Sequence, residues 1–396
     1  MENKRVLMIK YGEIALRGRN RYIYENMLLD AIRRNLRLAG FDDSEFRLGK
    51  EQGRFVVEWT EEVDFGRILP HVASIFGITS VGIAVKLATS DIQGIEQAAL
   101  EYTRGHCTTP ATFKVFTKRA DKSFPMTSDV LSAHIGGVLL DNIEGLKVNL
   151  TSPDFILKIE VRNHVYIYSA EMETKGLGGL PPGSAGKGVL LLSGGIDSPV
   201  AGFLAAKRGI GLTAVYFHSP PYTSERAKEK VADLAQRLSF YAGKLRLIVV
   251  PFTDIQLRLV EKTPPEKITI LLKRAMLKIS SKIAENNGAL ALVTGDSVGQ
   301  VASQTLHSLH AMGGTTNLPI LRPLACFDKQ EIVAISEKIE TYAISIRPYD
   351  DCCTLFLPKH PETKPKLSII QNIENSISNL EELIEKAITE AEIIDF

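Results

Sequence analysis

Apolar and polar positions follow a mixed pattern through the first 167 residues. Alternating apolar residues predict strands at 6–10 and 54–58, and a helical period predicts a helix at 22–39 between them. The same mixture continues with predicted helices at 63–76, 92–104 and 127–142 and predicted strands at 82–87, 112–117, 155–161 and 164–169. Such a mixture is typical of small α+β domains, and we expect them at 1–60 and 61–167.

The pattern changes after residue 188. Unbroken apolar stretches alternate there with amphipathic segments, and they lie at 189–192, 213–217, 245–250 and 289–294. Within the predicted helix 224–241, Val231, Leu234 and Leu238 share one face. Buried strands between amphipathic helices predict a doubly wound parallel sheet over 189–396. A Gly- and Pro-rich stretch predicts a linker at 168–188, and an acidic helix is expected at 369–388.

Composition narrows the class of protein. The chain has 396 residues, 44% of them apolar, and its formal net charge is +1. No apolar run is long enough for a signal peptide or a membrane span, and the four cysteines have neither a disulfide framework nor metal-binding spacing. We therefore expect a cytoplasmic protein with reduced thiols, no membrane partner and no tightly bound metal or organic cofactor. Residues 1–37 hold nine Lys or Arg against four acids, which indicates either a basic binding face or an ordinary solvated helix.

The stretch "SGGIDS" lies between an apolar strand and a helix that a proline helps to start. Its glycines, Gly194 and Gly195, allow a ligand to approach the backbone, and the hydroxyls of Ser193 and Ser198 add donors. Backbone N–H groups and the helix dipole at such a turn favour a phosphate. The alternative is a plain turn in which Ser198 caps the helix. Asp197 beside a triphosphate would need a divalent cation, so we assign it to magnesium-pyrophosphate binding, with a helix-end charge as the alternative.

This loop resembles the pyrophosphate loop of the PP-loop ATPases, which adenylate a substrate. Seven segments in order resemble the tRNA 4-thiouridine synthetase (tRNA sulfurtransferase) family from about residue 5 to 368. They are "YGEIALRGRNR", "FTKRADKSFPMTS", "LLLSGGIDSPVA", "FHSPPYTSERAKEK", "TGDSVGQVASQT", "RPLACFDKQEI" and "SIRPYDDCCTLFLPKHPETKP". The resemblance implies an N-terminal ferredoxin-like domain, a THUMP domain and a C-terminal PP-loop (adenine nucleotide α-hydrolase-like) domain, in the form that lacks a rhodanese domain.

The family also implies an ATP site. By the match to the family, the residues at two strand ends would flank the adenine: Leu191, Leu192, Tyr216 and Phe217. By the same match, Lys273, Gly295 and Gln304 would line the rest of the nucleotide pocket. Lys329 matches a catalytic lysine placed near the phosphates. Read alone, Lys273 is a solvated lysine, Gly295 belongs to a simple turn, and Lys329 follows a helix-capping Asp328.

The implied tRNA contacts are basic residues in two segments: Arg17, Arg19, Arg21, Lys114, Lys118, Arg119 and Lys122. In the second segment they are interleaved with Phe113, Phe116 and Phe124, and such a surface binds phosphates and stacks exposed bases. A strand followed by a solvated basic loop is the alternative.

The implied reaction replaces the carbon-4 oxygen of uridine 8 in tRNA with sulfur after ATP has adenylated that oxygen. A carrier cysteine should be exposed, and the polar loop around Cys352 and Cys353 suits that role; alignment with the family favours Cys353. With no rhodanese cysteine in view, we expect a cysteine desulfurase to supply the persulfide. The family also implies sulfur transfer to the sulfur carrier protein of thiamine biosynthesis, and a homodimer. A PP-loop amidotransferase and a non-enzymatic RNA-binding module are the competing interpretations.

Overall fold

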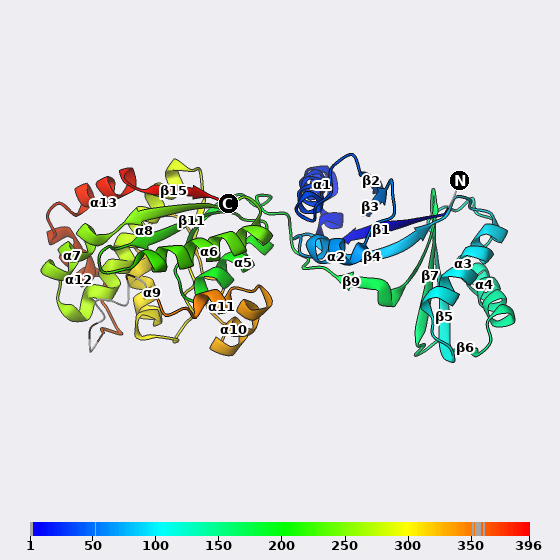
Figure 1. Ribbon diagram of the computed structural model, residues 1–396. Helices are drawn as coiled ribbons and strands as arrows, with labels where there is room; N and C mark the ends of the chain where they lie inside the picture. The colour runs from blue at the N-terminus through cyan, green and yellow to red at the C-terminus, as the bar shows by residue number, and fades with distance from the viewer. Residues whose placement is uncertain (1–2, 52, 351, 353–357, 359–360) are drawn as a thin grey trace. The chain divides into compact units, whose positions relative to one another are not determined.

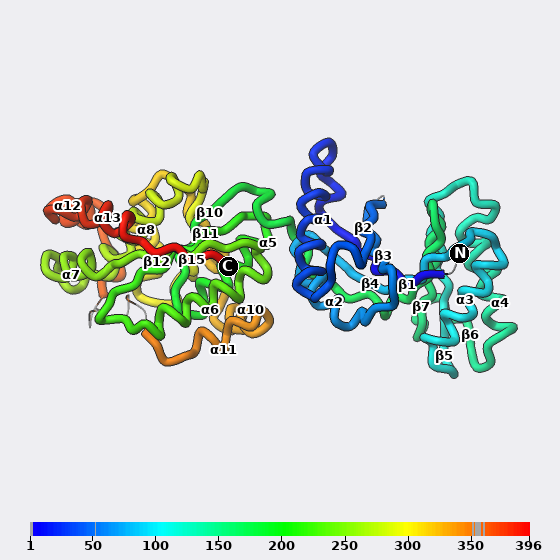
Figure 2. The backbone as a smooth tube through the Cα atoms, turned by 45° about the horizontal axis from the view of Figure 1, so that its top comes forward, coloured from blue at the N-terminus to red at the C-terminus, as the bar shows by residue number. Residues whose placement is uncertain are grey.

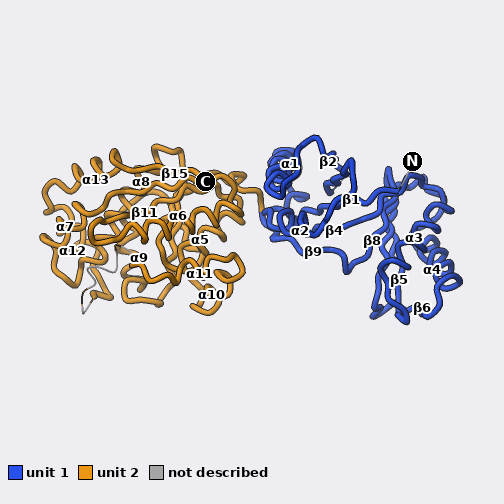
Figure 3. The backbone as a smooth tube through the Cα atoms, viewed as in Figure 1, with its two compact units in different colours: residues 1–179 blue, residues 180–396 orange. Residues whose placement is uncertain are grey.

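The structure is a computed structural model that describes residues 3–51, 53–350, 352, 358 and 361–396, and Figures 1 and 2 show it from two directions. The chain forms two compact units, residues 1–179 and 180–396 (Figure 3). The predicted linker 168–188 spans the boundary between them. Part of it, Glu173–Lys175, is strand β9 of the first unit.

The first unit is built on one continuous sheet of nine strands among the described residues. Its order is β2-β3-β1-β4-β8-β7-β5-β6, and β9 pairs with β4. The strands are β1 (Lys4–Tyr11), β2 (Phe46–Glu51), β3 (Arg54–Trp59), β4 (Ile78–Lys86), β5 (Ala111–Arg119), β6 (Leu146–Val148), β7 (Phe155–Val161) and β8 (Val165–Ser169). The helices are α1 (Arg21–Leu38), α2 (Phe65–Ala73), α3 (Ile92–His106) and α4 (Ser128–Asn142), with short 3₁₀ turns η1 (Glu13–Leu16), η2 (Gly18–Asn20) and η3 (Ala170–Met172).

Strand pairing places the first subdivision of this unit later than we expected. Strand β4 is antiparallel to β1 along its whole length, with Lys4 opposite Lys86 and Lys10 opposite Ser80. Residues 61–86 therefore complete the sheet begun by residues 1–60, which differs from the expected boundary at 60–61. The change of pattern at residue 60 marks only the end of strand β3. The pairing of β4 with β1 is what shows that the next elements belong to the same domain as residues 1–60.

The second unit has the expected parallel sheet, in the order β14-β13-β10-β11-β12-β15. Its strands are β10 (Lys187–Leu191), β11 (Gly211–His218), β12 (Arg246–Pro251), β13 (Ala291–Val293), β14 (Ile320–Leu321) and β15 (Glu392–Asp395). All neighbours are parallel except β15, which pairs antiparallel with β12 at the edge. The helices are α5 (Asp197–Lys207), α6 (Glu225–Ala242), α7 (Thr253–Lys262), α8 (Ile268–Asn286), α9 (Leu306–Gly313), α10 (Lys329–Lys338), α11 (Tyr342–Ser345), α12 (Leu367–Ser376) and α13 (Leu380–Thr389), with 3₁₀ turns η4 (Pro265–Lys267) and η5 (Ala302–Gln304).

The single acidic helix expected at 369–388 is wrong, because the chain breaks there into α12 and α13. Asn379 has a left-handed backbone (φ 64°) at the break. The turn lets Ile370 of α12 and Ile384 of α13 both enter the core, where each is fully buried. The break at Asn379 is not encoded in the helical pattern, which continues through this position.

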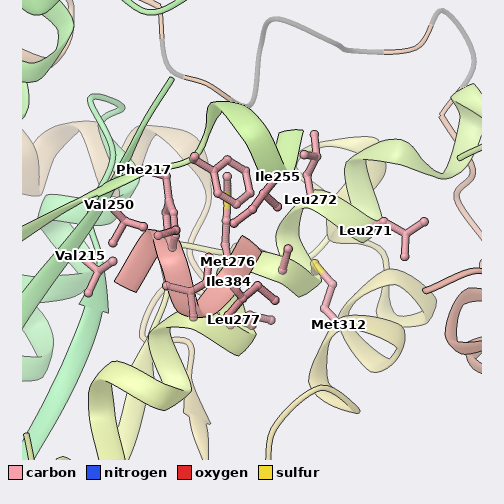
Figure 4. Close-up of a cluster of buried hydrophobic side chains, with 14 of the residues drawn as sticks. Val215, Phe217, Val250, Ile255, Leu271, Leu272, Met276, Leu277, Met312 and Ile384 are labelled. Carbon is pink, nitrogen blue, oxygen red and sulfur yellow. The ribbon is translucent and has the colours of Figure 1, made fainter. Parts of the chain in front are cut away.

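Helix α8 is the centre of this core. Leu271 and Leu272 are both buried although they point to different sides, as expected for a helix covered all round. Figure 4 shows Met276 and Leu277 of α8 packed near Phe217. The same three side chains line a cavity in this unit, so this core also forms part of the wall of the candidate site. None of the helices in the described part of the chain combines the length and apolarity that crossing a bilayer requires.

Candidate active site

The Ser-Gly-Gly turn lies between β10 and α5, as predicted. The hydroxyl of Ser198 accepts from the backbone N–H of Ser193 at 2.9 Å and lies 3.0 Å from the Ser193 hydroxyl. Helix α5 begins at Asp197, and its N-cap position, Ile196, makes no side-chain cap. Ser198 therefore closes the loop on itself, and the alternative in which it caps the helix is wrong.

Gly295 has a steric role at this turn. A Cβ at that position would lie 2.8 Å from the backbone nitrogen of Ser198 and 2.9 Å from the carbonyl carbon of Asp197. Real Cβ atoms do not approach backbone so closely, so only glycine lets the loop after β13 pass beside the start of α5. Since β10 and β13 are neighbours in the sheet, the loops that follow them lie side by side at its carboxyl edge.

Asp197 accepts from two side chains that come from distant parts of the chain. The Lys329 ammonium lies 2.6 Å from Oδ1, and Gln300 Nε2 donates to Oδ2 at 2.9 Å. Lys329 opens α10, where Asp328 and Glu331 form a capping box. Asp328 thus caps the helix, as the plain interpretation held, while the Lys329 ammonium pairs with Asp197 although its side chain stays partly exposed to water.

A cavity of about 260 Å³ opens at this edge of the sheet. Its walls include ten of the twelve residues predicted to contact ATP: Leu191, Leu192, Ser193, Asp197, Ser198, Tyr216, Phe217, Lys273, Gly295 and Gln304. The two others, Gly194 and Gly195, belong to the same loop but do not line the cavity. Six further residues line it that the sequence did not single out as ATP contacts: Met276, Leu277, Thr294, Asp296, Met312 and Cys352. The tertiary structure thus gathers the predicted positions around one space, and their role as nucleotide ligands stays a prediction.

Asp296 organises the polar wall of the cavity. Its carboxylate accepts from the Lys273 ammonium at 3.2 Å, from the Thr294 hydroxyl at 2.8 Å and from Gln304 at 3.4 Å, and Arg322 lies 3.7 Å away. Burial acts to raise the pKa of Asp296, but Lys273, Thr294 and Arg322 outweigh it and hold the pKa below its ordinary value. The sequence interpretation missed this residue; its place directly after an apolar strand, at the edge where ligands bind, was the available signal.

The sequence suggested that Cys352 lies in an exposed loop, and the structure shows that it does not. Its side chain is buried in the core and lines the cavity, and its carbonyl accepts from Gln256 Nε2 at 2.8 Å. Cys353, the predicted sulfur carrier, lies outside the described residues. Of the other cysteines, Cys326 is exposed in the second unit, whereas burial raises the pKa of the half-buried Cys107 thiol in the first.

The predicted RNA-binding residues near the N-terminus divide into exposed and engaged side chains. Arg17 and Arg19 are exposed, and the Arg17 guanidinium lies over the ring of Tyr24 at 4.9 Å. Arg21 instead donates to Glu25 at 2.6 Å and to the hydroxyl of Tyr11. Arg21 therefore supports the fold, while Arg17 and Arg19 remain open to a partner.

The second basic segment divides in the same way. Lys118 and Lys122 are exposed, Lys114 donates to the carbonyl of Leu150 at 3.2 Å, and Arg119 donates to two loop carbonyls at 3.0 Å. The expected stacking surface needs correction. Phe113 and Phe124 are buried in the core because they lie on the inner side of β5 and its loop, whereas Phe116 points outward and is 50% exposed.

Comparison with known proteins agrees with this architecture along the whole chain. The protein named "Probable tRNA sulfurtransferase" in Lachnoclostridium phytofermentans is 45% identical over 98% of this chain and 99% of its own length. Its namesake in Acetivibrio thermocellus is 48% identical over 99% of this chain and 98% of its own. The chain belongs to the tRNA sulfurtransferase family. The solved structure described as "Crystal structure of a 4-thiouridine synthetase - RNA complex with bound ATP" superposes with a TM-score of 0.89 at 38% identity, covering 99% of this chain and 100% of that one.

Three family models divide the chain. The ThiI ferredoxin-like domain matches residues 6–82, the THUMP domain residues 89–170, and the thiamine biosynthesis protein (ThiI) model residues 183–379. The predicted fold, ferredoxin-like and THUMP domains followed by a PP-loop domain, is thereby confirmed. The models put the first subdivision between residues 82 and 89, where the pairing of β4 with β1 also puts it.

Proposed function

We propose that this tRNA sulfurtransferase is an ATP-dependent tRNA uracil 4-sulfurtransferase that makes 4-thiouridine at position 8 of tRNA. The observation that carries the proposal is the meeting of the Ser-Gly-Gly loop, Asp197 and Lys329 at a cavity whose wall includes Cys352. Cys353, to which we assign the persulfide, is the next residue in the chain. An enzyme that activates a base and then thiolates it requires a phosphate site and a sulfur carrier that can serve the same base. The solved relative described as an RNA complex with bound ATP supports the same substrates for this chain.

The cavity suits ATP in both of its parts. Leu191, Tyr216 and Phe217 supply apolar surface for an adenine ring. At the other part of the cavity, the hydroxyls of Ser193 and Ser198 and the N-terminus of α5 favour phosphates. Asp197 would hold a magnesium ion together with phosphate oxygens, and that ion would neutralise charge on the departing pyrophosphate. The Lys329 ammonium, 2.6 Å from Asp197, is within reach of the same phosphates.

The chemistry then has two displacements. The carbon-4 oxygen of uridine attacks the α-phosphate, and pyrophosphate leaves; holding both reactants in one site supplies much of the acceleration. The terminal sulfur of a cysteine persulfide next attacks carbon 4, and AMP leaves with the former carbonyl oxygen. A second thiolate finally attacks the enzyme-side sulfur of the resulting disulfide, which releases 4-thiouridine and leaves a protein disulfide for an external reductant. We assign the persulfide to Cys353.

The partners follow from this chemistry. A pyridoxal-phosphate cysteine desulfurase would supply the persulfide sulfur in the reducing cytoplasm, and the exposed Arg17, Arg19, Lys118 and Lys122 would bind tRNA phosphates. We further propose that the protein acts as a homodimer. Sulfur transfer to the carrier protein of thiamine biosynthesis is a second function, favoured by the match to the thiamine biosynthesis protein model over residues 183–379.

The test is reconstitution with purified tRNA, ATP, magnesium, cysteine and a cysteine desulfurase. Pyrophosphate should appear only when tRNA is present, and liquid chromatography of the digested tRNA should show 4-thiouridine. An amidotransferase would consume ATP without making the thiolated base, and an RNA-binding module would release no pyrophosphate. Either result would overturn the proposal.

A further inference from the structure

A buried lysine holds the chain just ahead of the two adjacent cysteines. Lys230 lies on the inner face of α6 and is 4% exposed. Its ammonium donates to the carbonyls of Arg347 at 3.0 Å and Tyr349 at 3.3 Å, in the irregular stretch that follows α11. Asp233, one turn further along α6, pairs with the Arg347 guanidinium. A buried ammonium is costly unless it is well bound, so this position is adapted to these carbonyls.

A buried glutamine holds the same stretch at its far end. Gln256 of α7 is 1% exposed, and its Nε2 donates to the carbonyl of Cys352 at 2.8 Å. The start of the stretch is tied to the phosphate-binding loop, because the hydroxyl of Ser345 donates to the carbonyl of Gly195 at 3.3 Å. Ser345, Arg347, Tyr349 and Cys352 are therefore each held by a hydrogen bond, from the Ser-Gly-Gly loop at one end to the cavity wall at the other.

We propose that Lys230 and Gln256 are positioning residues for sulfur transfer. They bind backbone carbonyls, so they fix the positions of Arg347, Tyr349 and Cys352 without contacting substrate themselves. Cys352 is thereby held at the cavity wall. Cys353 is the next residue in the chain. This inference rests on the proposed function, since it assigns the two side chains to the second displacement and not to adenylation. Misplacement of reacting groups by about 1 Å can cost on the order of 100-fold in rate.

The test compares Lys230→Met and Gln256→Met in the full-length protein. Both variants keep side-chain volume but remove the donors. We expect single-turnover formation of 4-thiouridine to fall about 10- to 100-fold, while tRNA-dependent pyrophosphate release stays within about twofold. Lys230→Arg, which can still donate to two carbonyls, should recover most of the loss. Lys228→Met is the matched control, because this half-buried lysine of the same helix bonds Glu392 of β15.

A second readout does not depend on activity. Iodoacetamide labelling of Cys352, followed by mass spectrometry, should be at least about tenfold faster in both methionine variants, because loss of an anchoring hydrogen bond favours local opening. Labelling of Cys326 in the same samples corrects for reagent concentration. Unchanged labelling of Cys352 in both variants, or a parallel fall in pyrophosphate release, would overturn the inference. If the wild-type protein makes no 4-thiouridine, the proposed function fails, and the labelling still decides whether the two residues hold Cys352. Should Lys230→Met not fold, Gln256→Met carries the test alone.

Discussion

Replacing Asp197 by asparagine should separate catalysis from stability. The substitution preserves shape and removes the charge that faces Lys329. The Lys329 side chain is 46% exposed, so water screens the ion pair, and its loss should cost no more than about 1 kcal/mol of folding free energy. For a unit of this size, that lowers Tm by roughly 2–4 °C at most.

The effect on adenylation should be far larger. Asp197 is the carboxylate that we assign to magnesium-pyrophosphate binding, and loss of one such electrostatic contact typically costs about 100- to 1,000-fold in rate. The assay is pyrophosphate release with saturating ATP and tRNA, alongside tRNA binding by gel shift, which should stay unchanged. Asp254→Asn is the control, because it also removes a carboxylate paired with a lysine (Lys386, 3.1 Å) but away from the cavity. A near-normal rate from Asp197→Asn would refute the assigned role.

Three further outcomes are expected. Glu374→Leu should lower the free energy of unfolding, measured in urea, by about 3–5 kcal/mol. The reason is that the buried Arg274 guanidinium, which lies 2.6 Å from the Glu374 carboxylate, would lose its counter-charge; a loss under about 1 kcal/mol would contradict this account. Residues 1–179 alone should bind tRNA with affinity that falls at least about tenfold between roughly 50 and 200 mM salt, and an unchanged Kd would argue against phosphate contacts. Cys353→Ser should abolish 4-thiouridine in the chromatographic assay but spare pyrophosphate release, whereas Cys352→Ser keeps substantial activity; normal product from Cys353→Ser would exclude it as the carrier.

Local pattern was sufficient for the parallel strands of the second unit, but not for the break between α12 and α13 or for the antiparallel edge strand β15. A strand buried on both faces must be apolar throughout, and a helix that covers it must be amphipathic, so each element carries its own signature. The "SGGIDS" turn was recognisable for the same reason. Its glycines, hydroxyls and carboxylate stand together in sequence, and its flanks place it at the carboxyl edge of the sheet.

Only the tertiary structure decided what each of several residues faces. Asp296 was not singled out from the sequence, and its role depends on Lys273, which is 23 positions away in the chain and 3.2 Å away in the fold. Cys352 belongs to a polar, proline-rich stretch of sequence, yet its side chain is buried in the core and its carbonyl accepts a hydrogen bond from Gln256. The odd spacing of Phe113 and Phe116 places them on opposite faces of β5, but the alternation does not say which face is covered; the structure shows that it is the face of Phe113. The period of apolar residues determines which residues share a face of a helix or strand. Which segment packs against that face depends on contacts between residues far apart in the chain, and a local pattern holds no information about them.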